Sequence, residues 1–275
     1  MPYASADRAN LYYEETGSGE PIVFVHEFAA DLRAWESQVR HLSRGYRCIA
    51  FNARGYTPSD VPLTADAYGC EHSAKDIGAV LDHLKIANAH IVGLSMGAYA
   101  AMLFGIRQPQ RVRSLVLAGV GSGSEPGQTA EFRHSSRRMA DQLELDGFTK
   151  IADEFAMGPN RRQLAAKDPR GWRETVEQLR EHSAKGSAMT MRHYQSERPT
   201  VYDYDADLRK LNAATLVIVG DEDEPCLNVS VYLKRTLPNA DLIVIPGTGH
   251  SVNLEEPTVF NHALAAFIGC VQRGQ

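Results

Sequence analysis

The chain has 275 residues, of which 43% are hydrophobic and 23% are charged, a composition that supports a large core and excludes a disordered protein. Its 29 basic and 34 acidic side chains leave a formal charge of −5, so it lacks the positive field of a nucleic-acid-binding protein. Its apolar runs, such as residues 21–25 and 216–219, are far shorter than the roughly 20 residues that cross a bilayer, so no membrane span is predicted.

The ends and the cysteines add two further expectations. The first residues lack the positive segment and apolar stretch of a secretory signal, which favours a cytoplasmic location. The four cysteines are scattered without disulfide-framework, redox or zinc-site spacing, and no H-E-x-x-H, phosphate-binding or dinucleotide-binding motif is present. We therefore expect free thiols, no metal and no cofactor.

Short apolar runs alternate along the chain with longer stretches of helical periodicity, which is typical of parallel strands joined by crossover helices. Most of these runs are rich in Val, Ile and Leu, as expected for strands that are buried on both faces. Strands are predicted at residues 11–15, 22–26, 47–52, 90–94, 114–118, 215–219 and 242–245, and helices at 71–85 and 257–267. The fold class is α/β.

The alternation is interrupted once, between the strand that ends near Gly119 and the strand that begins at Thr215. A Gly and Ser run opens this interval at residues 121–124, and helical patterns follow at 131–145, 148–156, 170–182 and 187–197. An all-helical insertion between two strands is a candidate cap. We therefore predict an α/β core at residues 1–121 and 201–275 and a helical cap at 122–200.

A Gly-x-Ser-x-Gly motif, Gly93-Leu94-Ser95-Met96-Gly97, follows one predicted strand and precedes a run of helix-forming residues. A sharp turn between a strand and a helix exposes a serine hydroxyl, and flanking glycines remove side chains that would collide there. The amino end of the following helix also favours negative charge that develops beside the serine. Ser95 is therefore the candidate nucleophile.

A serine hydroxyl needs a base within hydrogen-bond reach, and the base needs an orienting carboxylate. Of the ten histidines, His250 is favoured because it lies in a glycine-containing loop directly after the last predicted strand. Four acids compete at residues 221–224, and Asp223, three residues past Gly220, is our choice. The resulting order Ser95, Asp223, His250 is the chain order of one known fold.

With these motifs, the segments Val25-His26 and Asn52-Ala53-Arg54-Gly55-Tyr56 complete a resemblance to the α/β-hydrolase-fold serine hydrolases of the capped esterase, lactonase and meta-cleavage hydrolase type. The likeness extends over about residues 21–267, and the cap matches only in position and helicity. The resemblance implies a mostly parallel central sheet flanked by helices, with the cap inserted between two late strands.

The resemblance also assigns supporting residues. It implies that the backbone N–H groups of Phe28 and Met96 form the oxyanion hole and that Arg54 braces the nearby loops. His26 ends a strand, and we interpret it as a loop anchor. Cys226 follows the acidic loop, where it either lines the pocket or, as we prefer, packs in the core.

Two residues depart from the family pattern. Asn52 stands where an aspartate is common, and Glu27 follows His26 where the family usually has glycine. A carboxylate beside the oxyanion hole opposes the developing charge unless it is protonated, paired or turned away. Glu27 is therefore either a functional acid or gate at the active site, as in dienelactone hydrolases, or a residue that points into solvent or pairs with Arg54.

The sequence thus predicts a cofactor-independent serine hydrolase of small or medium carboxylic esters. A lactone, an amide or a carbon–carbon bond is the alternative substrate, because the same triad serves those reactions. Two other classes stay open, and both draw on Glu27: a slow-turnover ligand receptor and a cofactor-free lyase, perhydrolase or oxygenase. The expected partner is a small molecule rather than nucleic acid or a membrane, and the sequence leaves the oligomeric state open.

Overall fold

The computed structural model describes residues 2–274 and builds this part of the chain around one eight-stranded sheet. The strands are β1 (Tyr3–Ala6), β2 (Ala9–Thr16), β3 (Glu20–Val25), β4 (Tyr46–Phe51), β5 (Ala89–Leu94), β6 (Val112–Ala118), β7 (Ala214–Gly220) and β8 (Ala240–Ile245). They lie in the order β1-β2-β4-β3-β5-β6-β7-β8. β1 and β2 pair antiparallel and β2 pairs antiparallel with β4, whereas β4, β3 and β5 to β8 run parallel. The predicted α/β class is confirmed, and β1 is the strand that the pattern missed.

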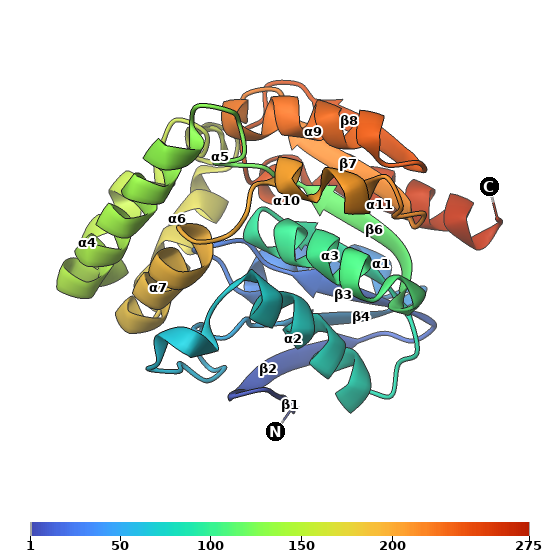
Figure 1. The fold of residues 1–275 in the computed structure, drawn as a ribbon, viewed down its shortest axis with the longest axis horizontal. Coiled ribbons are helices and arrows are strands. Elements are labelled where there is room, and N and C mark those ends of the chain that lie inside the picture. Colours follow the sequence, from blue (N-terminus) through green and yellow to red (C-terminus); the bar gives the residue numbers. More distant parts are fainter. Residues whose placement is uncertain (1, 275) are drawn as a thin grey trace.

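The helices connect these strands and cover both faces of the sheet (Figure 1). They are α1 (Glu36–Leu42), α2 (Cys70–His83), α3 (Met96–Arg107), α4 (Thr129–Ala156), α5 (Arg162–Lys167), α6 (Pro169–Arg180), α7 (Ala184–Thr190), α8 (Asp205–Leu208), α9 (Glu224–Thr236), α10 (Val252–Glu255) and α11 (Pro257–Gln272). Of the helices between residues 2 and 274, none is both long and apolar enough to span a lipid bilayer.

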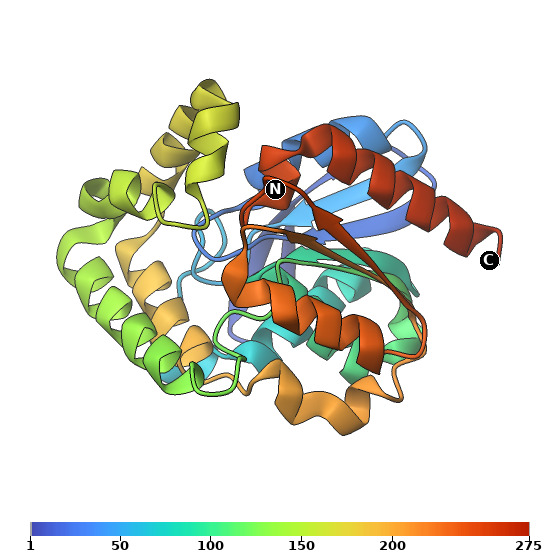
Figure 2. The same ribbon diagram turned by 90° about the horizontal axis from the view of Figure 1, so that it is seen from above.

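Each central strand contributes to two apolar layers, because successive side chains point to opposite faces of a sheet. In β3, Val23 and Val25 join the layer that includes residues of α2, α3 and α9. Ile22 and Phe24 join the other layer, with residues of α1 and α11. Figure 2 shows α11 and α9 on opposite sides of the strands. This double burial explains why the strands are continuous apolar runs in the sequence.

Helices α4 to α7 occupy the interval between β6 and β7 and lie together at one side of the sheet (Figures 1 and 2). We call residues 122–200 the helical insert. Gly147 interrupts α4 with a φ of 61°, so α4 consists of two helical stretches that match the predicted ranges 131–145 and 148–156. The apolar side chains of the insert, Leu143 and Phe148 among them, are continuous with the apolar layer that contains residues of α2, α3 and α9.

Candidate active site

Ser95 lies at the sharp turn between β5 and α3, with a φ of 53° that non-glycine residues rarely adopt. Close packing accounts for both flanking glycines. A Cβ atom on Gly93 would lie 2.4 Å from the Gly97 carbonyl oxygen, and one on Gly97 would lie 2.1 Å from the Val25 carbonyl oxygen. The turn therefore presents a partly exposed Ser95 at the carboxyl edge of the sheet.

Asp223 and His250 follow β7 and β8 at the same edge, and both are buried. His250 Nδ1 and Asp223 Oδ2 are 2.8 Å apart, which leaves Nε2 as the outer nitrogen of the ring. Ser95 N–H donates to the Ala118 carbonyl at 2.8 Å, and a Cβ on the next residue, Gly119, would lie 3.4 Å from both Asp223 Oδ2 and His250 Cε1. The three residues of the predicted triad thus gather around the end of β6.

The electrostatics of this pair favour a charged imidazole. Burial raises the pKa of Asp223, but the charge and hydrogen bond of His250 outweigh it, so the pKa of that carboxyl lies below its ordinary value. Burial lowers the pKa of His250, and the Asp223 charge and hydrogen bond raise it well above its ordinary value. Such stabilisation of the imidazolium is what a histidine requires when it accepts a proton from serine.

Two residues that the sequence reasoning missed hold the His250 loop. Glu255 accepts hydrogen bonds from the Gly249 N–H at 2.6 Å and the Ser251 N–H at 3.1 Å, on either side of the histidine. Asn160 of the insert accepts from the His250 N–H at 2.7 Å and donates to Asp223 Oδ1 at 3.4 Å. The sequence offers one signal for the loop that contains Asn160. Gly158-Pro159, between two predicted helices, is typical of a turn or loop.

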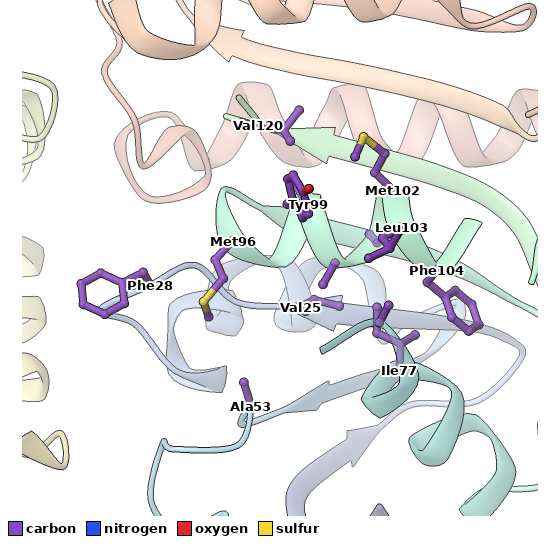
Figure 3. Packing of buried hydrophobic residues seen from close by; sticks show 14 of the residues in the cluster. Val25, Phe28, Ala53, Ile77, Met96, Tyr99, Met102, Leu103, Phe104 and Val120 are labelled. Carbon is purple, nitrogen blue, oxygen red and sulfur yellow. The ribbon is translucent and has the colours of Figure 1, made fainter. Parts of the chain in front are cut away.

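Phe28 and Met96, expected to form the oxyanion hole, are both buried. Met96 is the first residue of α3, where a helix leaves its N–H groups without intrahelical partners. The Phe28 ring packs against Phe148 and Phe155 of the insert, at centroid distances of 6.1 and 6.0 Å. Figure 3 shows Phe28 and Met96 near the amino end of α3. Both residues therefore lie at the same end of α3 as the Ser95 turn.

Glu27 neither points into solvent nor pairs with Arg54, and both of those expectations are wrong. Only 2% of Glu27 is exposed, because its carboxylate lies beneath the insert, where it forms an ion pair with Arg161. The Ser251 hydroxyl donates to its Oε1 at 2.9 Å, and its Oε2 is 3.7 Å from His250 Nε2. A carboxylate therefore lies directly beside the outer nitrogen of the histidine.

The charge state of Glu27 follows from these contacts. Burial raises its pKa, but the charges of Arg161 and His250 and the hydrogen bonds from Arg161 and Ser251 outweigh burial and lower it. Glu27 is therefore an anion whose charge is balanced by a cation of the insert. Arg161 escaped the sequence analysis because an arginine in a polar helical segment carries no local signal of its partner.

Arg54 is buried elsewhere. Its guanidinium makes two hydrogen bonds to Asp76, at 2.8 and 2.6 Å, and others to the Ala67 and Asp7 carbonyls. It ties α2 to the loop after β4 and has no contact with Glu27. His26 also ties loops together, because its Nε2 accepts from the Ala53 N–H at 2.9 Å while Nδ1 lies 2.7 Å from the Glu27 carbonyl. Burial lowers the pKa of His26 to about 4, so the ring is neutral.

Cys226 is fully buried, and its thiol contacts the Gly119 carbonyl at 3.2 Å. Its sulfur, an Asp223 oxygen and a His250 nitrogen lie within 4.8 Å of one another, and among residues 2–274 this is the one such group of metal-binding atom types. The histidine nitrogen and the carboxylate already bond each other, and burial raises the pKa of the thiol, which disfavours thiolate. The bonded pair of Asp223 and His250 therefore suits proton transfer better than metal binding.

A cavity of about 640 Å³ opens between the sheet edge and the insert. Its walls include the apolar side chains of Phe155, Trp172 and Leu179, and Glu27, Arg161 and Ser251 also line it. Neither Ser95 nor His250 is among its lining residues. The Glu27 ion pair therefore faces the cavity on one side and His250 on the other.

Comparison with known proteins agrees with this fold. A family model described as alpha/beta hydrolase fold matches residues 20–257. The 2-hydroxy-6-oxononadienedioate/2-hydroxy-6-oxononatrienedioate hydrolase of Burkholderia vietnamiensis is 28% identical over 94% of this chain and 90% of its own length. A non-heme haloperoxidase of Rhodococcus erythropolis is 29% identical over 98% and 99%. A thermophilic esterase of Thermogutta terrifontis superimposes with a TM-score of 0.86, at 26% identity over 96% and 94% of the two chains.

Proposed function

We propose, from the premise that this chain belongs to the alpha/beta hydrolase fold family, that it is a cofactor-independent serine hydrolase of small or medium carboxylic esters. Relatives with hydrolase and esterase names support an enzyme of this class that acts on small molecules. The observation that supports the serine mechanism best is the buried 2.8 Å contact between His250 Nδ1 and Asp223, beside the Ser95 turn.

In this proposal Ser95 Oγ attacks the ester carbonyl carbon while His250 Nε2 accepts the serine proton. Asp223 keeps the ring oriented and stabilises the imidazolium. The negative oxygen of the tetrahedral intermediate is bound by the Met96 and Phe28 N–H groups, with help from the positive end of α3.

His250 then gives its proton to the departing alcohol, which leaves the acyl group on Ser95. Water attacks the acyl-enzyme, His250 accepts a proton from that water, and collapse of the second intermediate releases the acid and restores the serine. Every proton in this cycle is carried by His250.

The helical insert at residues 122–200 is the cap of this proposal. Its apolar side chains Phe155, Trp172 and Leu179 line the cavity of about 640 Å³. This volume lies within the range of roughly 300–1,000 Å³ typical of small-molecule pockets. Because the cavity borders Glu27 and Arg161 rather than Ser95 itself, we assign its walls to the far end of the acyl or alcohol part of the ester.

The decisive experiment is mass spectrometry after treatment with a fluorophosphonate probe, together with hydrolysis of a chain-length series of p-nitrophenyl esters. Wild type and Ser95→Ala are compared. The proposal expects probe attachment at Ser95, turnover that depends on Ser95, and an optimum chain length that reports the size of the cavity.

Absence of labelling together with turnover that survives Ser95→Ala would contradict acyl transfer at this serine. Absence of both labelling and turnover would favour the receptor alternative. Labelling without ester turnover would point instead to a lactone, an amide or a carbon–carbon bond as substrate.

A further inference from the structure

Arg161 lies where the insert meets the candidate active site, and it has no place in the serine mechanism above. We propose that Arg161 is a positioning residue for catalysis: it neutralises Glu27 and holds that carboxylate off His250 Nε2 and the oxyanion position. This inference rests on the proposed serine mechanism and assigns the electrostatic condition under which the mechanism operates.

Glu27 precedes Phe28, whose N–H is a proposed oxyanion donor, and Glu27 Oε2 is 3.7 Å from His250 Nε2. An unbalanced carboxylate here would oppose the negative charge that develops on the substrate oxygen. It would also stabilise a protonated His250 in the resting enzyme, and only the neutral imidazole can accept the Ser95 proton. Both effects slow acylation, so the site needs a cation or a proton on Glu27.

Arg161 supplies that cation from a fixed position. Its guanidinium pairs with Glu27 Oε2, contacts Ser251 Oγ at 3.3 Å and lies 4.8 Å from the centre of the Phe155 ring. Burial lowers the pKa of Arg161, but Glu27 outweighs burial and raises it, so the group stays charged. The adjacent Asn160 binds the His250 backbone, which fixes the loop against the triad.

A purely structural role is the competing explanation, in which the ion pair only fastens the insert to the core. The two explanations differ in what removal of Glu27 does. If Arg161 acts by balancing the Glu27 charge, its loss is harmless once Glu27 is neutral. If it only fastens the insert, replacement of Glu27 gives no rescue, because the fastening is still broken.

The experiment compares Arg161→Met, Glu27→Gln and the double variant by steady-state hydrolysis of p-nitrophenyl butyrate, with thermal unfolding as a fold check. Arg161→Met is expected to lower kcat about 100-fold with little change in KM, a loss of the size seen when one oxyanion contact is removed. The double variant is expected to fall within about threefold of Glu27→Gln, and Arg161→Lys to retain most of the activity because the charge remains. Arg192→Met, which breaks an ion pair internal to the insert, is the control.

Wild-type kcat in Arg161→Met overturns the proposal, and so does a double variant as slow as Arg161→Met. If Arg161→Met does not fold, Glu27→Gln decides, because it also breaks the ion pair. A kcat within about threefold of wild type supports charge balance, whereas a loss of about 100-fold shows that the fastening is what matters and overturns the proposal. Ser95→Ala separates the two levels of the argument. Turnover that persists in Ser95→Ala refutes the serine mechanism itself, whereas loss there with normal Arg161→Met refutes only the inference.

Discussion

The sheet and the helical insert contribute to the same site in different ways. Around the sheet, local backbone positions the groups: glycines allow the Ser95 turn, and Glu255 holds the loop of His250 through adjacent N–H groups. In the insert, the loop of Asn160 and Arg161 reaches residues more than 60 positions away in the chain. The difference suggests that the sheet supplies the reacting groups and the insert sets their charge environment.

Asp223→Asn tests the sheet side of this comparison and should have the largest effect. An amide keeps the shape of the carboxylate but favours the wrong histidine tautomer and no longer stabilises the imidazolium. We expect kcat for p-nitrophenyl esters to fall about 10,000-fold, while the thermal unfolding of the protein stays close to wild type. A loss of less than about tenfold would contradict the role of Asp223.

The pH profile sharpens the same prediction. Burial lowers the pKa of His250, but Asp223 raises it well above the ordinary value. Since only the neutral imidazole accepts the serine proton, kcat/KM of wild type should fall as pH drops through that raised pKa. Removal of the Asp223 charge lowers the pKa, so the acid limb of Asp223→Asn should move to lower pH.

Arg54→Met addresses the stability of the sheet side. Arg54 and Asp76 form a buried ion pair between α2 and the loop after β4. Loss of one partner leaves a buried charge unpaired, so the free energy of unfolding in urea should fall by about 3–5 kcal/mol. The double variant Arg54→Met/Asp76→Leu removes both charges and should regain part of that loss. Equal destabilisation of the two variants would show that packing, not charge, is responsible.

The success of the predictions from sequence differs between the same two regions. The seven predicted strands, the Ser95 turn and the order of Asp223 and His250 all carry local signals: apolar runs, glycines and strand ends. The strand β1 was missed because Tyr3-Ala4-Ser5-Ala6 has no apolar run. The surroundings of Glu27 were missed because its partner Arg161 is brought to it by tertiary contacts alone, and no spacing in the sequence encodes such an approach.

Asn160→Ala tests the insert side at an uncharged position. The variant removes the side-chain contact to Asp223 Oδ1 at 3.4 Å but keeps the backbone carbonyl that accepts from the His250 N–H. Because the lost contact is long, we expect kcat to fall about tenfold, equivalent to about 1.4 kcal/mol. Hydrolysis of p-nitrophenyl butyrate measures it, with Asn160→Asp as the companion variant. The aspartate adds a charge that repels Asp223 and should be slower than alanine; the reverse order would contradict a role through Asp223.

Arg192→Met should have the smallest effect. It tests a part of the insert that makes no contact with the candidate catalytic residues. Arg192 pairs with Asp141 and Glu144, all within the insert, and its side chain is 29% exposed. Exposed ion pairs contribute about 0.2–1 kcal/mol, so the free energy of unfolding should fall by less than about 1 kcal/mol. Because the pair contacts neither Glu27 nor the loop of Asn160, kcat should equal that of wild type. A substantial loss of kcat would mean that the whole insert, rather than its one loop, tunes the site, and the division between the two regions would have to be redrawn.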